Sequence, residues 1–338
     1  MPPIKSIPLV PEIPAELKIA GKQGRLVPFV GAGVSQLAGC PGWSEFAEKC
    51  LTHLLLHNKL NHALLDQLHA RKLSPRVILA LALNWAKQGG ETPIDFMSIL
   101  HPEGWAQHVD GNRVYRALAA LSRHFVTTNY DFWLDTIPPA LASLSTNSGA
   151  AASALPVKRH CVYKPDQILI STLDRTDAST VTHLHGSLLD IETMVLTTSQ
   201  YVSRYADCRQ PDNGVNLNHT QVFLEHLFGL KSILFVGYGL DELEILEYVI
   251  LKARRQLAQG SRVASHFILQ PFFSHELEIA NAIGKYFQNE CGVTLIPYLR
   301  DALDYAQLIE VLEGFTREIS ASPLLNAERR YAMEQMLK

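Results

Sequence analysis

The chain has few cysteines, and they lie far apart. It has 338 residues and five cysteines, none of them in a Cys-x-x-Cys pair: Cys40, Cys50, Cys161, Cys208 and Cys291. Scattered cysteines without such a pair argue against both a disulfide framework and a structural zinc ribbon. We therefore expect reduced, mostly buried thiols and no bound metal.

Long apolar runs and an excess of one charge are also missing. No window holds the roughly 18 uncharged apolar residues that a membrane span needs. The Pro-rich segment 1–14 lacks the apolar core of a signal peptide. The 30 basic and 33 acidic residues nearly balance, so no broad surface for nucleic acid or for an anionic membrane is indicated. We expect a soluble, cytoplasmic protein that binds neither nucleic acid nor membrane directly.

What the sequence does contain is an alternation of short apolar runs with helical patterns. The clearest runs, which we predict to be strands, are 27–30, 124–126, 161–163, 168–170, 181–184, 194–196, 232–236, 266–269 and 293–296. Such alternation is typical of a parallel sheet with helices on both faces. We predict an α/β fold built on a doubly wound, mainly parallel, Rossmann-like sheet.

Helical patterns fill the long interval between the first two predicted strands. Apolar stripes at helical spacing run through residues 43–122, and we interpret this segment as a helical insertion that forms one wall of a cleft. Later helices are predicted over 130–136, from 198 onward, and over 222–230, 241–257, 276–287 and 302–315. We predict a Pro-rich arm at 1–20, one domain at 21–320 and a C-terminal helix or tail at 321–338.

Four of the predicted strands run into small polar turns. These turns are Gly31-Ala32-Gly33-Val34-Ser35, Thr127-Thr128-Asn129-Tyr130-Asp131, His185-Gly186-Ser187 and Gly237-Tyr238-Gly239-Leu240-Asp241. The turns that follow parallel strands gather at one edge of a doubly wound sheet, where such folds bind ligands. We therefore predict that the four turns form one pocket.

Each turn taken alone has a simpler interpretation. Gly31-Ala32-Gly33 matches only part of a dinucleotide fingerprint, because Gln36 stands where a third glycine is required. It is either a tight turn or a place where a diphosphate approaches a helix N-terminus. Asn129 could serve only as a helix cap. His183 and His185 share a strand face, but no acidic or cysteine residue nearby supports zinc binding.

Taken in order, the four turns resemble those of the sirtuin-like (silent-information-regulator-like) superfamily. Gly39-x-Pro41-x-Trp43 and Leu196-Thr197-Thr198-x-x-Tyr201 are similar to its bacterial branch of NAD hydrolases used in anti-phage defence. The resemblance spans residues 26–315. The chain departs from the protein deacylases of the superfamily, because it lacks their four-cysteine zinc module. Thr128 and Tyr130 also replace the Gln and Ile of their Thr-Gln-Asn-Ile-Asp motif.

The resemblance implies roles for the residues of the turns. Asn129 would hold the ribose or the attacking water, and His185 would act as general base with an ordinary pKa of about 6.5. Asp131 would lie at the nicotinamide or ribose end, and Thr128 would also bind the substrate. The diphosphate would be bound by Gly31, Ala32, Gly33 and Ser35, and the adenosine side would be lined by Gly237, Gly239 and Asp241.

The resemblance also implies an activity. The expected reaction is hydrolysis of NAD, used as substrate, to ADP-ribose and nicotinamide by the effector subunit of a bacterial anti-phage defence system. Because uncontrolled NAD loss would kill the cell, we expect a separate sensor or regulatory protein encoded nearby, and a homo- or hetero-oligomer. Two alternatives remain at this stage: an NAD-dependent protein deacylase, which needs an acylated peptide, and a non-catalytic module that binds NAD or ADP-ribose.

Overall fold

A sheet of seven parallel strands runs through the computed structural model of the protein, which describes residues 4–88, 93–101, 108–137, 157–205, 218–239 and 265–319. The strand order is β5-β6-β2-β1-β7-β8-β9. The bounds are β1 (Leu26–Val30), β2 (His124–Thr127), β5 (His160–Val162), β6 (Thr180–His183), β7 (Ser232–Val236), β8 (His266–Phe272) and β9 (Val293–Leu299). The predicted α/β class and parallel sheet are confirmed.

The order of the strands places a crevice at the centre of the sheet. From β1 the chain moves to β2 on one side, and it later returns to β7 on the other side. Val30 is in register with both Thr127 and Val236, so the carboxyl ends of these three strands are level. Turns that leave neighbouring strands in opposite directions open a ligand crevice between them. The four polar turns follow β1, β2, β6 and β7 and meet at this place.

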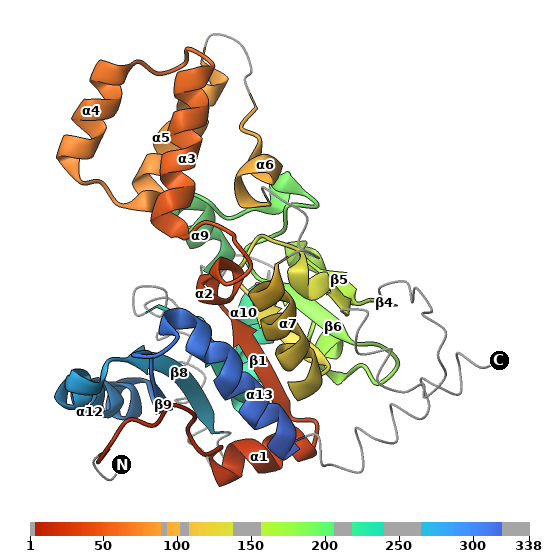
Figure 1. Ribbon diagram of the computed structural model, residues 1–338. Helices are drawn as coiled ribbons and strands as arrows, with labels where there is room; N and C mark the ends of the chain where they lie inside the picture. The colour runs from red at the N-terminus through yellow and green to blue at the C-terminus, as the bar shows by residue number, and fades with distance from the viewer. Residues whose placement is uncertain are drawn as a thin grey trace, which may run out of the picture.

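Helices cover both faces of the sheet, as Figure 1 shows. One face carries α1 (Ala15–Lys22), α7 (Val109–Leu121) and α13 (Gln307–Ile319), and the other carries α10 (His219–Leu230) and α12 (Leu277–Tyr286). Successive strand residues enter opposite cores: Val30 packs on the first face and Phe29 on the second. This two-sided burial explains why β1 is an unbroken apolar run rather than an alternating one.

The helical insertion between the first two strands is also confirmed, and Figure 1 shows its first part standing away from the sheet. It contains α3 (Trp43–Leu56), α4 (His62–Arg71), α5 (Pro75–Lys87) and α6 (Phe96–Leu100), followed by α7. We refer to α3–α6 as the helical module. Its core, which includes Phe46 and Leu79, continues onto Tyr130 and Leu196 of the sheet domain. Burial of one such side chain contributes about 1.5–3 kcal/mol, so these apolar contacts hold the module against the sheet domain.

Three local predictions differ from the structure. Residues 130–136 do not form an α-helix: a 3₁₀ turn, Trp133–Asp135, is followed by β3 (Thr136–Ile137), which pairs with β4 (Val157–Lys158). Residues 168–170 lead into a 3₁₀ helix, Ile170–Asp174, instead of forming a strand. The segment 194–196 is irregular because its backbone bonds to the His185 carbonyl and the Tyr130 hydroxyl, not to a neighbouring strand.

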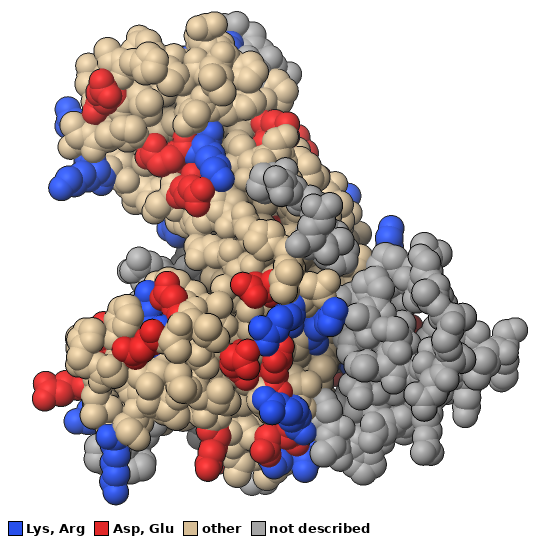
Figure 2. Space-filling view, in the orientation of Figure 1, with Lys and Arg blue, Asp and Glu red and all other residues tan. Residues whose placement is uncertain are grey.

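The remaining elements are short. They comprise α2 (Ala32–Gln36), α9 (Thr198–Tyr205), the 3₁₀ segments Pro165–Gln167, Ile191–Thr193, Ser274–Glu276 and Asp304–Ala306, and a π-helical turn, Phe287–Cys291. The predicted helix at 241–257 and the predicted tail at 321–338 lie outside the described residues. None of the helices within the described ranges is long and apolar enough to cross a membrane. On the face in Figure 2, acidic and basic side chains are interspersed.

Candidate functional site

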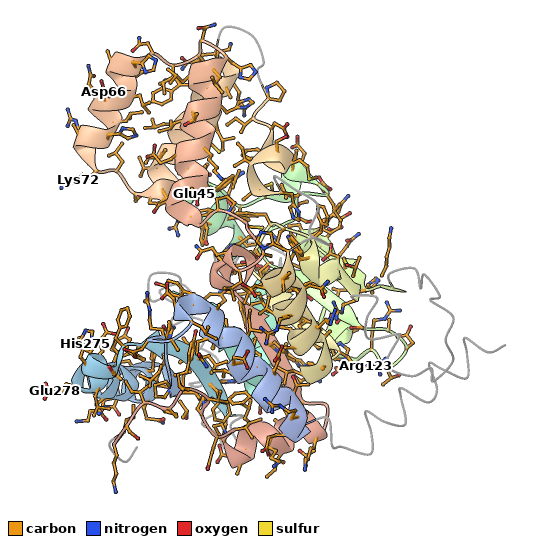
Figure 3. The ribbon with its side chains drawn as sticks, viewed as in Figure 1. Glu45, Asp66, Lys72, Arg123, His275 and Glu278 are labelled. Atoms are coloured by element: carbon orange, nitrogen blue, oxygen red, sulfur yellow. The ribbon has the colours of Figure 1, made fainter. Side chains whose placement is uncertain are left out.

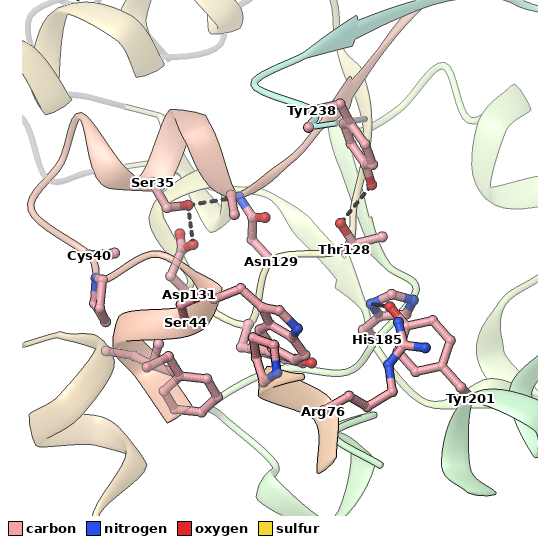
Figure 4. A pocket seen from close by; sticks show the side chains of 18 of the residues that line it. Ser35, Cys40, Ser44, Arg76, Thr128, Asn129, Asp131, His185, Tyr201 and Tyr238 are labelled. Atoms are coloured by element: carbon pink, nitrogen blue, oxygen red, sulfur yellow. Dashed lines mark hydrogen bonds between the residues drawn. The ribbon is translucent and has the colours of Figure 1, made fainter. Parts of the chain in front are cut away.

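A cavity of about 560 Å³ lies where the helical module meets the carboxyl ends of the central strands, and Figure 4 shows side chains that line it. The sheet side contributes Ala32, Ser35, Thr128, Asn129, Tyr130, Asp131, His185, Tyr238 and Gly239. The helical module, the two residues Cys40 and Pro41 before it, and α9 contribute the rest of the lining: Cys40, Pro41, Trp43, Ser44, Phe46, Ser74, Pro75, Arg76, Leu100, Thr198, Tyr201 and Tyr205. A concave site of this size, apolar with a few polar groups, suits a small-molecule ligand.

Asn129 is held with one end of its amide fixed and the other directed to the cavity. Its Nδ2 donates to the Gly31 carbonyl at 2.9 Å and to Ser35 Oγ at 2.7 Å. If the amide were reversed, its Oδ1 would face the Gly31 carbonyl oxygen, and neither oxygen can donate a hydrogen bond. The orientation of the amide is therefore determined. Its Oδ1 has no hydrogen-bond partner among the described residues and is left to accept from a ligand in the cavity.

Asp131 is fully engaged by the protein. Its Oδ2 accepts from Ser35 Oγ at 2.5 Å, and its Oδ1 accepts from the Trp133 backbone N–H at 3.2 Å and from Tyr115 Oη at 3.4 Å. Burial, followed by the Asp131 charge, raises the pKa of Tyr115, which therefore stays protonated and able to donate. Burial and Asp131 likewise raise the pKa of the Cys40 thiol, which excludes a thiolate nucleophile there at neutral pH.

The two glycine turns pack against each other. The Gly31 N–H donates to the Val236 carbonyl and the Gly33 N–H donates to the Gly237 carbonyl, each at 2.9 Å. A Cβ on Gly31 would lie 2.7 Å from the Gly237 oxygen, and Gly237 itself has a φ of +68°. Close approach of the turns thus accounts for both glycines, and two of the N–H groups predicted to bind a diphosphate are used within the protein.

His185 follows β6 and has both ring nitrogens occupied. Its Nε2 lies 2.7 Å from Tyr205 Oη, and its Nδ1 lies 3.3 Å from Tyr201 Oη. Burial lowers the pKa of His185 to about 3, and the charges of Arg204 and Arg76 act in the same direction. The imidazole is therefore neutral at neutral pH, and the expectation of an ordinary pKa near 6.5 is wrong because it neglected burial.

The pKa of His183, two residues earlier, is shifted in the opposite direction. It is completely buried, with Nε2 2.8 Å from Asp135 Oδ1 and Nδ1 3.2 Å from the Asn129 carbonyl oxygen. Burial lowers the pKa of His183, but Asp135 and the hydrogen bonds outweigh burial and raise it, which favours the charged form. The ring of His183 thus joins the Asp135 carboxylate to the peptide of Asn129.

The structure brings most of the predicted site residues together. The residues that line the cavity are Ala32, Ser35, Thr128, Asn129, Asp131, His185 and Gly239. Gly31, Gly33 and Gly237 lie behind its wall, against one another. Thr128 Oγ1 is bound to Tyr238 Oη at 2.6 Å. Asp241 lies outside the described residues. In the part of the chain that is described, no group of His, Cys, Asp or Glu side chains is placed to hold a metal ion.

A family model decides the classification of the chain. The SIR2-like domain model matches residues 123–296, just over half of the chain. The chain belongs to the SIR2-like domain family. No curated protein matches it. SIR2-like domains form a family of NAD-consuming enzymes, so the match supports an NAD-related activity. The matched part of this SIR2-like domain contains Asn129 and His185, whereas the Gly31 turn and the helical module precede it.

Several residues of the SIR2-like cavity were not predicted from the sequence. Arg76 follows Pro75, which occupies the first position of α5, where its missing N–H costs nothing. The Arg76 guanidinium lies 4.1 Å from the centre of the Tyr201 ring. Tyr205 stands four residues after Tyr201 on α9, and this spacing on a helix places both side chains on one face. That spacing was the only sequence signal that pointed to Tyr205.

We predict that Gly31→Ala destabilises the fold by about 1–3 kcal/mol, because the new Cβ overlaps the Gly237 carbonyl and the Tyr238 ring. Urea unfolding measures the change. Gly239→Ala is the matched control, since nothing described lies within 4 Å of a Cβ there. Equal stability of the two variants would contradict the packing of the turns.

We predict that the contribution of His183 to stability depends on pH. Its folded pKa is raised, so the contribution is fully present below the unfolded pKa of about 6.5 and is lost as pH rises through the folded pKa. His183→Gln should lower the free energy of unfolding by about 3–5 kcal/mol at low pH, and by less at high pH. The comparison is made by urea unfolding of both proteins from pH 5 to 9, and a pH-independent difference would count against a charged His183.

Proposed function

We propose that this protein hydrolyses NAD to ADP-ribose and nicotinamide, and that it is the effector subunit of a bacterial anti-phage defence system that depletes NAD when triggered. The observation that carries the reaction is the joint placement of Asn129 and His185 in one cavity at the crevice of a SIR2-like sheet. The defence role rests on the sequence resemblance alone.

The chemistry of the cavity fits this reaction. The leaving nicotinamide is already cationic, so the bond needs little acid assistance and its cleavage develops oxocarbenium character. The site must then orient the ribose and a water molecule. In the proposal the Asn129 Oδ1 accepts a hydrogen bond from a ribose hydroxyl or from the water, and the neutral His185 takes up a proton.

The cavity also fits an anionic dinucleotide. Arg76 is the single lysine or arginine among the described residues that line it, and its Nε is buried with no hydrogen-bond partner. The oxygens of the one carboxylate in the lining, Asp131, accept hydrogen bonds from three internal donors. In the proposal Ala32, Ser35 and Arg76 face the diphosphate, and Gly239 faces the adenosine. The phosphate charges would offset the effect of Arg76 on His185 and raise its pKa in the complex.

Control of the activity is part of the proposal. Continuous hydrolysis would exhaust the NAD of the cell, so a separate sensor or regulatory protein encoded nearby is proposed to trigger it within a homo- or hetero-oligomer. The segments 1–20 and 321–338 are the proposed contacts.

The test is NAD consumption by the purified full chain, alone and with the products of neighbouring genes. We expect Asn129→Ala and His185→Ala each to lower the rate by about 10²- to 10⁴-fold. Asp66→Ala is the control, because Asp66 is exposed on α4, far from the cavity (Figure 3). NAD loss only with an acylated peptide would indicate a deacylase instead. Binding of NAD without turnover under every condition would indicate a binding module.

The dependence of kcat/KM on pH provides a second prediction. This ratio reports the free enzyme, in which His185 has a pKa of about 3. The base is then available throughout the neutral range and is lost only as pH falls through about 3. We expect the pH profile of kcat/KM to show no inflection near pH 6.5 that can be assigned to His185. An inflection assigned to His185 would be present in the wild type and absent in His185→Ala. Such an inflection would show that His185 titrates as an exposed histidine.

A further inference from the structure

The proposed base does not itself present a free nitrogen to the cavity. His185 Nε2 is bound to Tyr205 Oη at 2.7 Å and Nδ1 to Tyr201 Oη at 3.3 Å. Both tyrosines line the cavity and both pack edge-on against the imidazole (Figure 4 shows Tyr201). Both ring nitrogens of His185 are therefore bonded to tyrosine hydroxyls of residues that also line the cavity.

A neutral His185 carries its ring proton on either Nδ1 or Nε2, and its two hydrogen bonds differ in length. In the described chain, the only hydrogen-bond partner of the Tyr205 hydroxyl is His185 Nε2, and this contact is the shorter of the two. A neutral imidazole has one donor and one acceptor nitrogen. The relay uses the tautomer in which Tyr205 donates to Nε2, the shorter contact, and Nδ1–H donates to Tyr201. The lone pairs of Tyr205 Oη remain available on the cavity side.

We propose that Tyr205 is a catalytic residue that relays a proton from the substrate to His185. The ribose hydroxyl or the attacking water gives its proton to Tyr205 Oη as Tyr205 passes its own proton to Nε2. One O–H bond breaks and one forms at Tyr205, the substrate oxygen gains the electron pair, and the histidine becomes the imidazolium. This role rests on the proposed hydrolysis of NAD.

The surroundings of the two tyrosines assign them different parts. The end of α9 is fixed by α10, because Asn218 donates to the Arg204 carbonyl at 3.0 Å and Gln221 to the Tyr205 carbonyl at 3.5 Å. Tyr205 is thereby held at the distance a relay requires. Tyr201 lies beneath the Arg76 guanidinium and accepts from Nδ1, so it orients the ring and stabilises the imidazolium. Tyr201 is a positioning residue.

Tyr205→Phe tests the relay, since it removes the hydroxyl and keeps the ring. We expect kcat to fall about 10²-fold or more, with KM within about threefold, and the double variant with His185→Ala to be no slower than His185→Ala alone. Tyr201→Phe, one turn away on the same helix and bound to the same ring, is the matched control. Its kcat should fall by less than about tenfold.

The outcomes separate this proposal from the one on which it rests. Loss of activity in His185→Ala with normal or increased kcat in Tyr205→Phe overturns the relay and leaves NAD hydrolysis standing. Absence of NAD consumption by the wild type, with and without the neighbouring gene products, overturns both. If Tyr205→Phe fails to fold, 3-fluorotyrosine keeps the ring and the hydroxyl and makes the hydroxyl more acidic. At position 205 it should change kcat by at least about twofold more than at position 201, and equal effects overturn the relay.

Discussion

The hydrogen bond from Ser35 to Asp131 decides which groups donate and which accept in the hydrogen bonds around Asn129. An ionised carboxylate can only accept, so Ser35 must donate to it and is left with only lone pairs for Asn129. Asn129 must then present its NH₂ group to Ser35 and its oxygen to the cavity. Asp131 thereby determines how the amide faces a ligand although its own oxygens are bound within the protein. The interaction also joins the turns after β1 and β2, which come from distant parts of the chain.

Two histidines two residues apart show how strongly the surroundings decide charge. His183 faces a carboxylate and a carbonyl in the interior, and these partners raise its pKa. His185 faces two hydroxyls near two arginines and is neutral. Burial lowers the pKa of both residues, so the difference comes from the partners. His183 contacts the peptide of Asn129, and His185 keeps a neutral ring at the cavity.

Much of the fold could be predicted from the sequence, because periodicity and strand-end turns are local signals. The parallel sheet, the helical insertion and the meeting of the four turns follow from them. What failed depended on partners distant in sequence. Burial, followed by the charges of Arg204 and Arg76, sets the pKa of His185, and contacts to Tyr130 and His185 set the irregular 194–196 segment. These contacts cannot be predicted from the local sequence pattern. The close packing of the Gly31 and Gly237 turns cannot be predicted from it either.

The cavity wall has two origins along the chain. The hydrogen-bonded groups of the sheet side lie largely within the segment that matches the SIR2-like family, whereas Trp43, Phe46 and Arg76 belong to the helical module before it. The module has its own apolar core and touches the sheet domain through a limited set of side chains such as Tyr130. Substitutions on its inner surface can therefore reshape the cavity, or change its charge, while Asn129 and His185 on the sheet side stay in place.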